Sequence, residues 1–132
     1  MEILKQIDQS LSEGYQAGAK VVRDGIVDNQ NWVIEWGRVL SDSEFEVGLA
    51  NKGVEEAREA RKAIRRGVHD DSEEAKRKVL EEFADQLTLI ESYMAHKGWP
   101  MEVLHAVKEQ KDLRMGTFEE KRMMKSVRRR NG

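Results

Sequence analysis

GVEEAREARKAIRRG at residues 53–67 and KVLEEFADQLTLIESYMAHKG at residues 78–98 consist mostly of strong helix formers. Each segment ends on glycine, which commonly stops a helix. Ahead of the first segment, Ser43 and Glu46 have the spacing of a capping box, in which each side chain bonds to the other residue's backbone N–H. We therefore expect a long helix over residues 43–67.

The second long helix is expected to run from about Ser72 to Lys97, because Asp71 and Glu74 in HDDSEE have cap spacing. Apolar side chains recur along both helices at intervals that place them on one face. The expected core stripes are Leu49, Gly53, Ala57, Ala60 and Ile64 on the first helix and Val79, Phe83, Leu87, Ile90 and Met94 on the second.

Three further helices are expected outside this pair. One runs over about residues 3–23 and ends at the Asp-Gly pair, and a short one covers residues 32–40, where large apolar side chains lie four and three residues apart. The last begins at Pro100, whose missing N–H costs nothing in the first turn, and is interrupted at RMGTF. The sequence thus predicts four or five helices.

Acidic side chains occur at helical spacing in both long helices, as Glu55, Glu56 and Glu59 in EEARE and as Glu82 and Asp85 in EEFAD. Residues three apart lie roughly 60° from each other around a helix, so Glu56 and Glu59 share a face, as do Glu82 and Asp85. Packing these faces together creates repulsion that hard divalent cations with oxygen ligands offset best. The pattern predicts a magnesium site between the helices.

Composition favours the all-α class. The 132-residue chain is 36% charged and only 6% aromatic, with a single proline, and its length suits one domain over residues 1–132. The net charge of −2 gives no overall attraction to nucleic acid or membranes, although the tail from about 119 to 132 is basic. Without cysteine, disulfides and thiolate zinc sites are excluded. No stretch has the ~18 apolar residues of a membrane span, so a cytoplasmic location is expected.

The acidic pattern, EExxE followed by ExxD, resembles the all-α nucleoside triphosphate pyrophosphohydrolases. This MazG-like group includes helical dUTPases, phosphoribosyl-ATP pyrophosphohydrolase and compact phage-type members. The order of helix, polar turn, helix, Gly-Trp-Pro break and basic helix is also similar, over a little more than half of the chain. The resemblance implies a helical bundle completed by oligomerisation into a homodimer or homotetramer.

The resemblance also implies an activity and its residues. A nucleoside or deoxynucleoside triphosphate would be hydrolysed to its monophosphate and pyrophosphate with two or more Mg²⁺, or Mn²⁺, ions per site. The implied metal ligands are Glu56, Glu59, Glu82 and Asp85, with Glu55 as a further ligand or a base that orients water. The plain alternative is that such spacings arise by chance on a solvated helical face.

Substrate contacts are predicted from residue types. On the expected basic helix, Lys108, Lys111 and Arg114 lie at spacings where long side chains reach a triphosphate, and Lys121 is a further phosphate-binding candidate. The run KEQKDLRMGTFEEK departs from the Asn or Lys signature and Gly-Gly-Phe-like turn common in the group, which leaves these phosphate contacts open.

A nucleobase needs a π face and a few polar groups. Trp32 and Trp36 could stack on the base, with guanine as the first choice, while Asn29, Gln30 or Asn31 hydrogen-bond its edge. Core or interface packing explains the two tryptophans better, because their i, i+4 spacing is that of a buried face. Two other functions stay open: a non-catalytic interaction protein with a basic tail, and a dUTPase-like hydrolase that also accepts a diphosphate.

Overall fold

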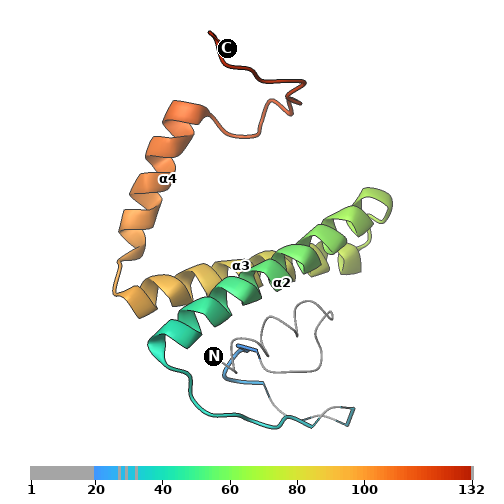
Figure 1. Cartoon of the computed structure of the whole chain (residues 1–132). Coiled ribbons are helices and arrows are strands. Elements are labelled where there is room, and N and C mark those ends of the chain that lie inside the picture. The colour runs from blue at the N-terminus through green and yellow to red at the C-terminus, as the bar shows by residue number, and fades with distance from the viewer. Residues whose placement is uncertain (1–19, 27, 29, 32, 132) are drawn as a thin grey trace. The chain divides into compact units, whose positions relative to one another are not determined.

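The computed structural model describes residues 20–26, 28, 30–31 and 33–131. In this part of the chain it contains three helices, α2 (Asp42–His69), α3 (Glu73–Lys97) and α4 (Met101–Met115), and no strand (Figure 1). The prediction of an all-α fold is therefore confirmed. The expected helix at residues 3–23 lies mainly outside the described residues, and its described end, residues 20–23, is not helical. None of the described helices has an apolar stretch long enough to cross a bilayer.

The capping box of α2 is formed by Ser41 and Glu44, so the predicted pair Ser43 and Glu46 was wrong by two residues. The Glu44 N–H donates to Ser41 Oγ at 3.3 Å, and the Ser41 N–H donates to Glu44 Oε1 at 3.0 Å. The Arg38 guanidinium holds the same carboxylate from the preceding segment through bonds of 2.8 and 2.5 Å. This additional partner, which precedes Glu44 by six residues, favours the earlier of the two similar caps.

The turn between α2 and α3 also differs slightly from its prediction. The helix passes Gly67 and ends at His69, and Ser72 caps the next helix by accepting the Ala75 N–H at 3.2 Å. The Ser72 N–H in turn donates to Asp70 Oδ1 at 3.0 Å. The predicted cap at Asp71 was therefore one residue early, while the extent of α3 was predicted closely.

The helix predicted at residues 32–40 is wrong for residues 33–40, which have no regular secondary structure. Val39 is 93% exposed and Trp36 56% exposed, so this segment does not bury the apolar side that was expected. A helix of two turns that contains Gly37 and several β-branched residues is unstable without a packing partner. Instead, the Ile34 N–H donates to Asp28 Oδ1 at 2.9 Å.

The core lies where α2 and α3 pack side by side along their length (Figure 1). Its buried apolar side chains are mostly small: Leu49, Ala60 and Ala63 from α2, and Ala75 and Met94 from α3. Alanine lets two helix backbones approach closely, so the contact follows this small-residue face. Three carboxylates are buried on the same two helices: Glu44 at the start of α2, and Glu56 and Glu82 further along the contact.

Only part of the predicted core stripes is buried. Leu49, Ala60 and Met94 are buried as predicted, and Gly53 and Val79 are half-buried. The members found exposed are Ala57, Ile64, Phe83, Leu87 and Ile90. Successive residues are separated by about 100° around a helix axis. A contact between α2 and α3 that is centred on Ala60 and Glu82 therefore leaves Phe83 on the outer side.

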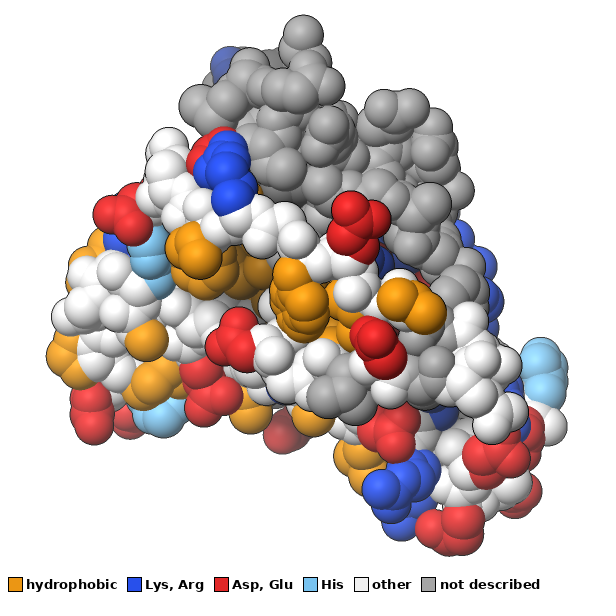
Figure 2. All heavy atoms as spheres, turned by 90° about the horizontal axis from the view of Figure 1, so that it is seen from below, with side chains coloured by type: hydrophobic (Ala, Val, Ile, Leu, Met, Phe, Trp, Pro, Cys, Tyr) orange, Lys and Arg blue, Asp and Glu red, His pale blue; other side chains and the backbone are white. Residues whose placement is uncertain are grey.

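The larger apolar side chains of α3 form a separate exposed stripe of Leu80, Phe83, Leu87 and Ile90, 45% to 56% exposed. The spacing alternates between three and four residues, which keeps the four side chains on one face. Figure 2 shows patches of hydrophobic side chains on one face of the molecule, with Asp and Glu side chains between them. Among the described residues, more large apolar side chains are exposed than are buried in the core.

The chain divides by its contacts into two compact units, Met1–Lys97 and Gly98–Gly132. Gly98 follows the end of α3 and has a φ of 72°. Gly116 is the C-cap of α4, has a φ of 77°, and donates its N–H to the Asp112 carbonyl. Both φ values lie in a region that glycine adopts without strain. α4 begins at Met101 with Pro100 as its N-cap, so the predicted start at Pro100 was one residue early, and the predicted interruption at RMGTF is confirmed.

Candidate metal centre

Three of the predicted acidic ligands converge between α2 and α3. Glu56 from α2 and Glu82 and Asp85 from α3 each offer one carboxylate oxygen, and these oxygens lie within 4.8 Å of one another. Two ligands on opposite sides of one Mg²⁺ or Ca²⁺ ion are about 4 to 5 Å apart. The separation therefore fits three oxygens around a single divalent cation.

Helix geometry explains why these side chains meet. Glu56 precedes the buried Ala60 by one turn, and Glu82 follows the buried Ala75 by seven residues, which is two turns. The small side chains on the contact face bring the two backbones together, so the longer glutamate side chains share the space between them. Asp85, one turn beyond Glu82, is only half-buried and borders this space.

Glu82 is the most buried carboxylate of the three. The residue is 4% exposed, and its Oε2 is buried without a hydrogen-bond partner. Its other oxygen, Oε1, forms an ion pair with Lys78 Nζ at 2.8 Å. Leaving a buried carboxylate oxygen unsatisfied is costly, and a bound cation would remove that cost.

Glu56 is the carboxylate most affected by its surroundings. Burial raises its pKa to about 7, and the Lys52 ammonium opposes this rise. The negative charge of Asp85 adds to the rise, and so does a hydrogen bond in which the protonated Glu56 carboxyl donates to Glu82. The charged form of Glu56 is thus disfavoured near neutral pH in the protein alone. A divalent cation would supply the positive charge that this ionised form requires.

Protein cations surround the group on its other sides. Lys52 Nζ lies 3.2 Å from Glu56 Oε1, and Arg23 Nη2 donates to Asp85 Oδ1 at 2.6 Å. With Lys78 on Glu82, every carboxylate of the group is paired with a lysine or arginine. These side chains act as counter-ions of the acidic group in the protein alone.

Glu55 and Glu59 are the remaining acidic residues of the predicted site, and neither belongs to the group of three. Glu55 borders the group, where Lys20 Nζ donates to its Oε1 at 2.8 Å and Lys52 Nζ lies 3.4 Å from its Oε2, which has no hydrogen bond. Glu59 is half-buried and outside the group of three oxygens, and its charge acts on Lys78. The structure thus brings together three of the four predicted ligands.

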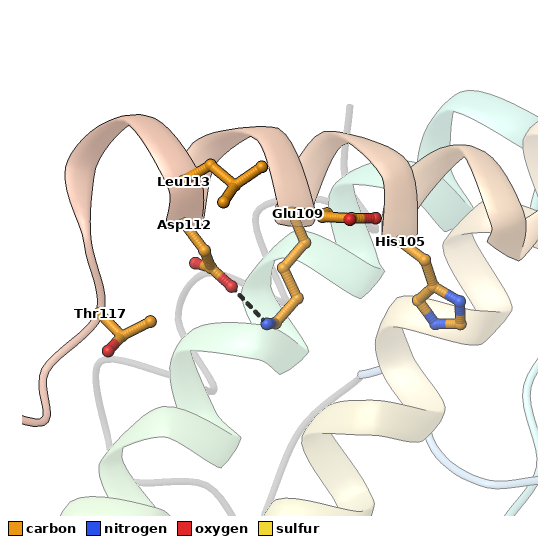
Figure 3. Close-up of a pocket in the computed structure, with 6 residues that line it drawn as sticks. His105, Glu109, Asp112, Leu113 and Thr117 are labelled. Atoms are coloured by element: carbon orange, nitrogen blue, oxygen red, sulfur yellow. Dashed lines mark hydrogen bonds and ion pairs between the residues drawn. The ribbon is translucent and has the colours of Figure 1, made fainter.

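The predicted phosphate-binding residues belong to the other compact unit, Gly98–Gly132. On α4, Lys108 Nζ forms an ion pair with Asp112 Oδ2 at 2.6 Å beside a shallow hollow of about 510 Å³ (Figure 3). Lys111, Arg114 and Lys121 are exposed to solvent. Their contact with a triphosphate stays a prediction.

The predicted base-binding residues lie in or near the irregular segment before α2. Trp32 and Asn29 are outside the described residues, while Trp36 and Asn31 are exposed. Stacking on a nucleobase therefore stays a prediction.

Four cations around the acidic group were missed by sequence reasoning. Lys52 and Lys78 stand four residues before Glu56 and Glu82, a spacing at which opposite charges meet on a helix, so the sequence did hold a signal for them. Lys20 and Arg23 come from a segment without regular structure. No local pattern could have connected them to carboxylates on α2 and α3.

Comparisons of the chain with protein-family models, with curated proteins and with solved structures gave no match. The acidic pattern and the geometry of its residues therefore have to support any functional conclusion by themselves.

Proposed function

We propose that the chain is a divalent-cation-dependent nucleoside triphosphate pyrophosphohydrolase, which releases a nucleoside monophosphate and pyrophosphate. The observation that supports this proposal is the group of Glu56, Glu82 and Asp85 with the buried, unpartnered Oε2 of Glu82. A chance arrangement on a solvated face would leave such side chains exposed and hydrated. Two of these three are buried instead.

The same group argues for a polyphosphate substrate. Carboxylates repel phosphates, so these residues contact such a substrate productively only through bound cations. Glu56, Glu82 and Asp85 would hold the Mg²⁺ or Mn²⁺, which supplies a Lewis acid for phosphoryl oxygens and lowers the pKa of water. In the reaction, a water oxygen bonds to the α-phosphorus while the bond to the bridging oxygen breaks and pyrophosphate leaves.

Glu55 is our candidate for the base that orients the attacking water. It borders the three-carboxylate group, and Lys20 and Lys52 hold its side chain in place. A purine nucleotide, guanine first, is the proposed substrate, since Trp32 and Trp36 offer large aromatic faces. Lys108, Lys111, Arg114 and Lys121 remain the proposed phosphate contacts from the basic part of the chain.

We further propose that a second copy of the chain completes the bundle, as in the MazG-like group, giving a homodimer or a homotetramer. The exposed stripe of Leu80, Phe83, Leu87 and Ile90 supports this proposal. Alternating steps of three and four residues form the seam along which helices pack in coiled coils. Covering this stripe would give α3 a second apolar contact beside its narrow contact with α2.

The proposed activity can be tested by pyrophosphate release from each common ribonucleoside and deoxyribonucleoside triphosphate, with Mg²⁺ and with EDTA. We expect release only with Mg²⁺, and its loss in Glu82→Gln. Glu81→Gln is the matched control, because Glu81 is an exposed neighbour on α3 paired with Arg77. Pyrophosphate from no nucleotide would contradict the proposal and favour a non-catalytic interaction protein.

Nucleoside diphosphates belong in the same panel. A dUTPase-like hydrolase would also cleave the deoxyuridine diphosphate to a monophosphate and inorganic phosphate, whereas the proposed activity requires a triphosphate.

A further inference from the structure

Two cations from a distant part of the sequence reach this region: Arg23 pairs with a carboxylate of the acidic group, and Lys20 pairs with the neighbouring Glu55. Arg23 lies 62 residues from Asp85 in the chain and donates to it at 2.6 Å, while Lys20 lies 35 residues from Glu55 and donates to it at 2.8 Å. Arg23 also lies 3.4 Å from the Thr88 hydroxyl. Both cations belong to an irregular segment, which can change its position more easily than a helix can.

These ion pairs compete with a divalent cation. Asp85 Oδ1, which accepts from Arg23, belongs to a carboxylate of the group that would hold the metal. A dication bound there would repel the adjacent guanidinium, because the two like charges would share one carboxylate. Arg23 would then leave Asp85 or find another anion beside it.

A polyphosphate bound to the same cation would be the new anionic partner of Arg23. Its oxygens would lie next to the metal, within the region that Arg23 and Lys20 already reach. Guanidinium groups bind phosphate through two parallel hydrogen bonds, and a lysine ammonium adds a compact charge. Arg23 is half-exposed, at 54% of its side chain, so it can turn outward without breaking the core.

We infer that Lys20 and Arg23 form a cationic strap that exchanges partners: it pairs with Glu55 and Asp85 in the metal-free protein and with the substrate's phosphates once divalent cations occupy the carboxylates. This inference rests on the proposed function and deepens it, because it assigns phosphate binding to the segment before α2. It makes the strap a competitor of the metal and a ligand of the polyphosphate.

The strap predicts opposite changes in the affinities for Mn²⁺ and for tripolyphosphate when Arg23 is replaced, which a purely structural role would not produce. Replacing Arg23 by alanine removes the competitor, so Mn²⁺ alone should bind several-fold more tightly. The same change removes a charged phosphate contact, so inorganic tripolyphosphate premixed with saturating Mn²⁺ should bind about ten-fold more weakly. A residue that only maintained the fold would weaken both.

The experiment is isothermal titration calorimetry of the full chain with Mn²⁺ alone and then with tripolyphosphate in saturating Mn²⁺. The variants are Arg23→Ala, Lys20→Met and Arg23→Lys. Of these, Arg23→Lys should keep part of the tripolyphosphate affinity, because it keeps the positive charge. Arg38→Ala is the matched control, since Arg38 also precedes α2 but pairs with Glu44, outside the acidic group. It should leave both affinities unchanged, and circular dichroism checks the helix content of each variant.

Either of two results would overturn the strap: weaker Mn²⁺ binding by Arg23→Ala, or unchanged tripolyphosphate affinity. If the wild-type chain binds no Mn²⁺, the proposed metal-dependent function fails, and the strap fails with it. If the wild-type chain binds Mn²⁺ and releases pyrophosphate but the variants show no opposite changes, only the strap is wrong.

Discussion

Glu82 is nearly inaccessible, and one of its oxygens has no hydrogen-bond partner, although a charged group of this kind normally requires several partners. If a divalent cation fills this role, Glu82→Gln should lower Mn²⁺ affinity at least about ten-fold, because a ligand charge is lost. Calorimetric titration with Mn²⁺ measures the loss. Urea denaturation without metal should show a folded variant.

The neighbouring Glu81→Gln, which changes an exposed residue paired with Arg77, should bind Mn²⁺ as the wild-type chain does. Equal losses in both variants would show a general charge effect and contradict the assignment of Glu82 as a ligand.

The raised pKa of Glu56 has a consequence for stability. Its value moves from 4.5 for an ordinary glutamate to about 7 in the fold, so the folded chain binds more protons than the unfolded chain between these pH values. The free energy of unfolding should therefore fall as pH rises from about 4.5 to 7, and this loss should be complete above 7. Glu56→Gln should remove this decrease and be the more stable chain at pH 8.

Urea denaturation of both chains at several pH values without metal measures this difference. Groups far from Glu56 titrate alike in both chains, so the difference between the two curves reports Glu56 together with its coupling to Asp85 and Glu82. A difference that stayed constant from pH 4.5 to 8 would show that Glu56 is not perturbed.

At the residue scale, the acidic spacing predicted the site because helical periodicity is a local property. The sequence could place Glu56 beside Glu59 and Glu82 beside Asp85, but it could not state which side of α2 would face α3. That orientation depends on where the backbones approach most closely, which is at Ala60 and Ala75. In the orientation that results, the Glu56 carboxylate belongs to the group of three oxygens and the Glu59 carboxylate does not.

At the element scale, the start of α2 is the clearest test of the structure. Ser41→Ala should lower the free energy of unfolding by about 1 kcal/mol, because it removes the oxygen that accepts the Glu44 N–H. Ser43→Ala should have little effect, since Ser43 is exposed and already inside the helix. Urea denaturation of the two variants compares them directly. A larger loss for Ser43→Ala would restore the cap that the sequence favoured.

Helices α2, α3 and α4 were predictable because each combines strong formers with nearby stop signals. The helix boundaries were harder to predict, because S-x-x-E occurs at both Ser41 and Ser43 and only the ion pair of Arg38 with Glu44 distinguishes the two. The failed helix at residues 33–40 shows the same limit. Apolar spacing alone cannot hold two turns together when no partner covers them.

At the scale of the whole molecule, the apolar residues of α3 are divided between two faces. The face on α2 carries Ala75, Glu82 and Met94, while Leu80, Phe83, Leu87 and Ile90 face outward. Sequence reasoning assigned most of the outer stripe to the core, since a larger apolar side chain is the usual mark of a buried face. Small residues and carboxylates instead form the contact, which places the acidic group between the helices.

The outer stripe allows a test of the proposed oligomer. Leu87→Glu places a charge in the middle of the stripe, where side chains are about half-exposed in the single chain. If a second copy covers this stripe, the buried charge should dissociate the assembly, and sedimentation equilibrium should give the 15.2 kDa of one chain in place of a multiple. Val39→Glu is the control, because Val39 is 93% exposed and lies in the irregular segment before α2.

In a chain that is monomeric already, Leu87→Glu should change the free energy of unfolding by less than about 0.5 kcal/mol, as exposed substitutions usually do, and leave the mass unchanged. A wild-type mass of 15.2 kDa would thus contradict assembly through this stripe. If the wild type is oligomeric and Leu87→Glu stays so, the copies meet elsewhere. Measuring pyrophosphate release in the dissociated variant would then show whether the carboxylates of one α2–α3 pair suffice for the proposed reaction or require the second copy.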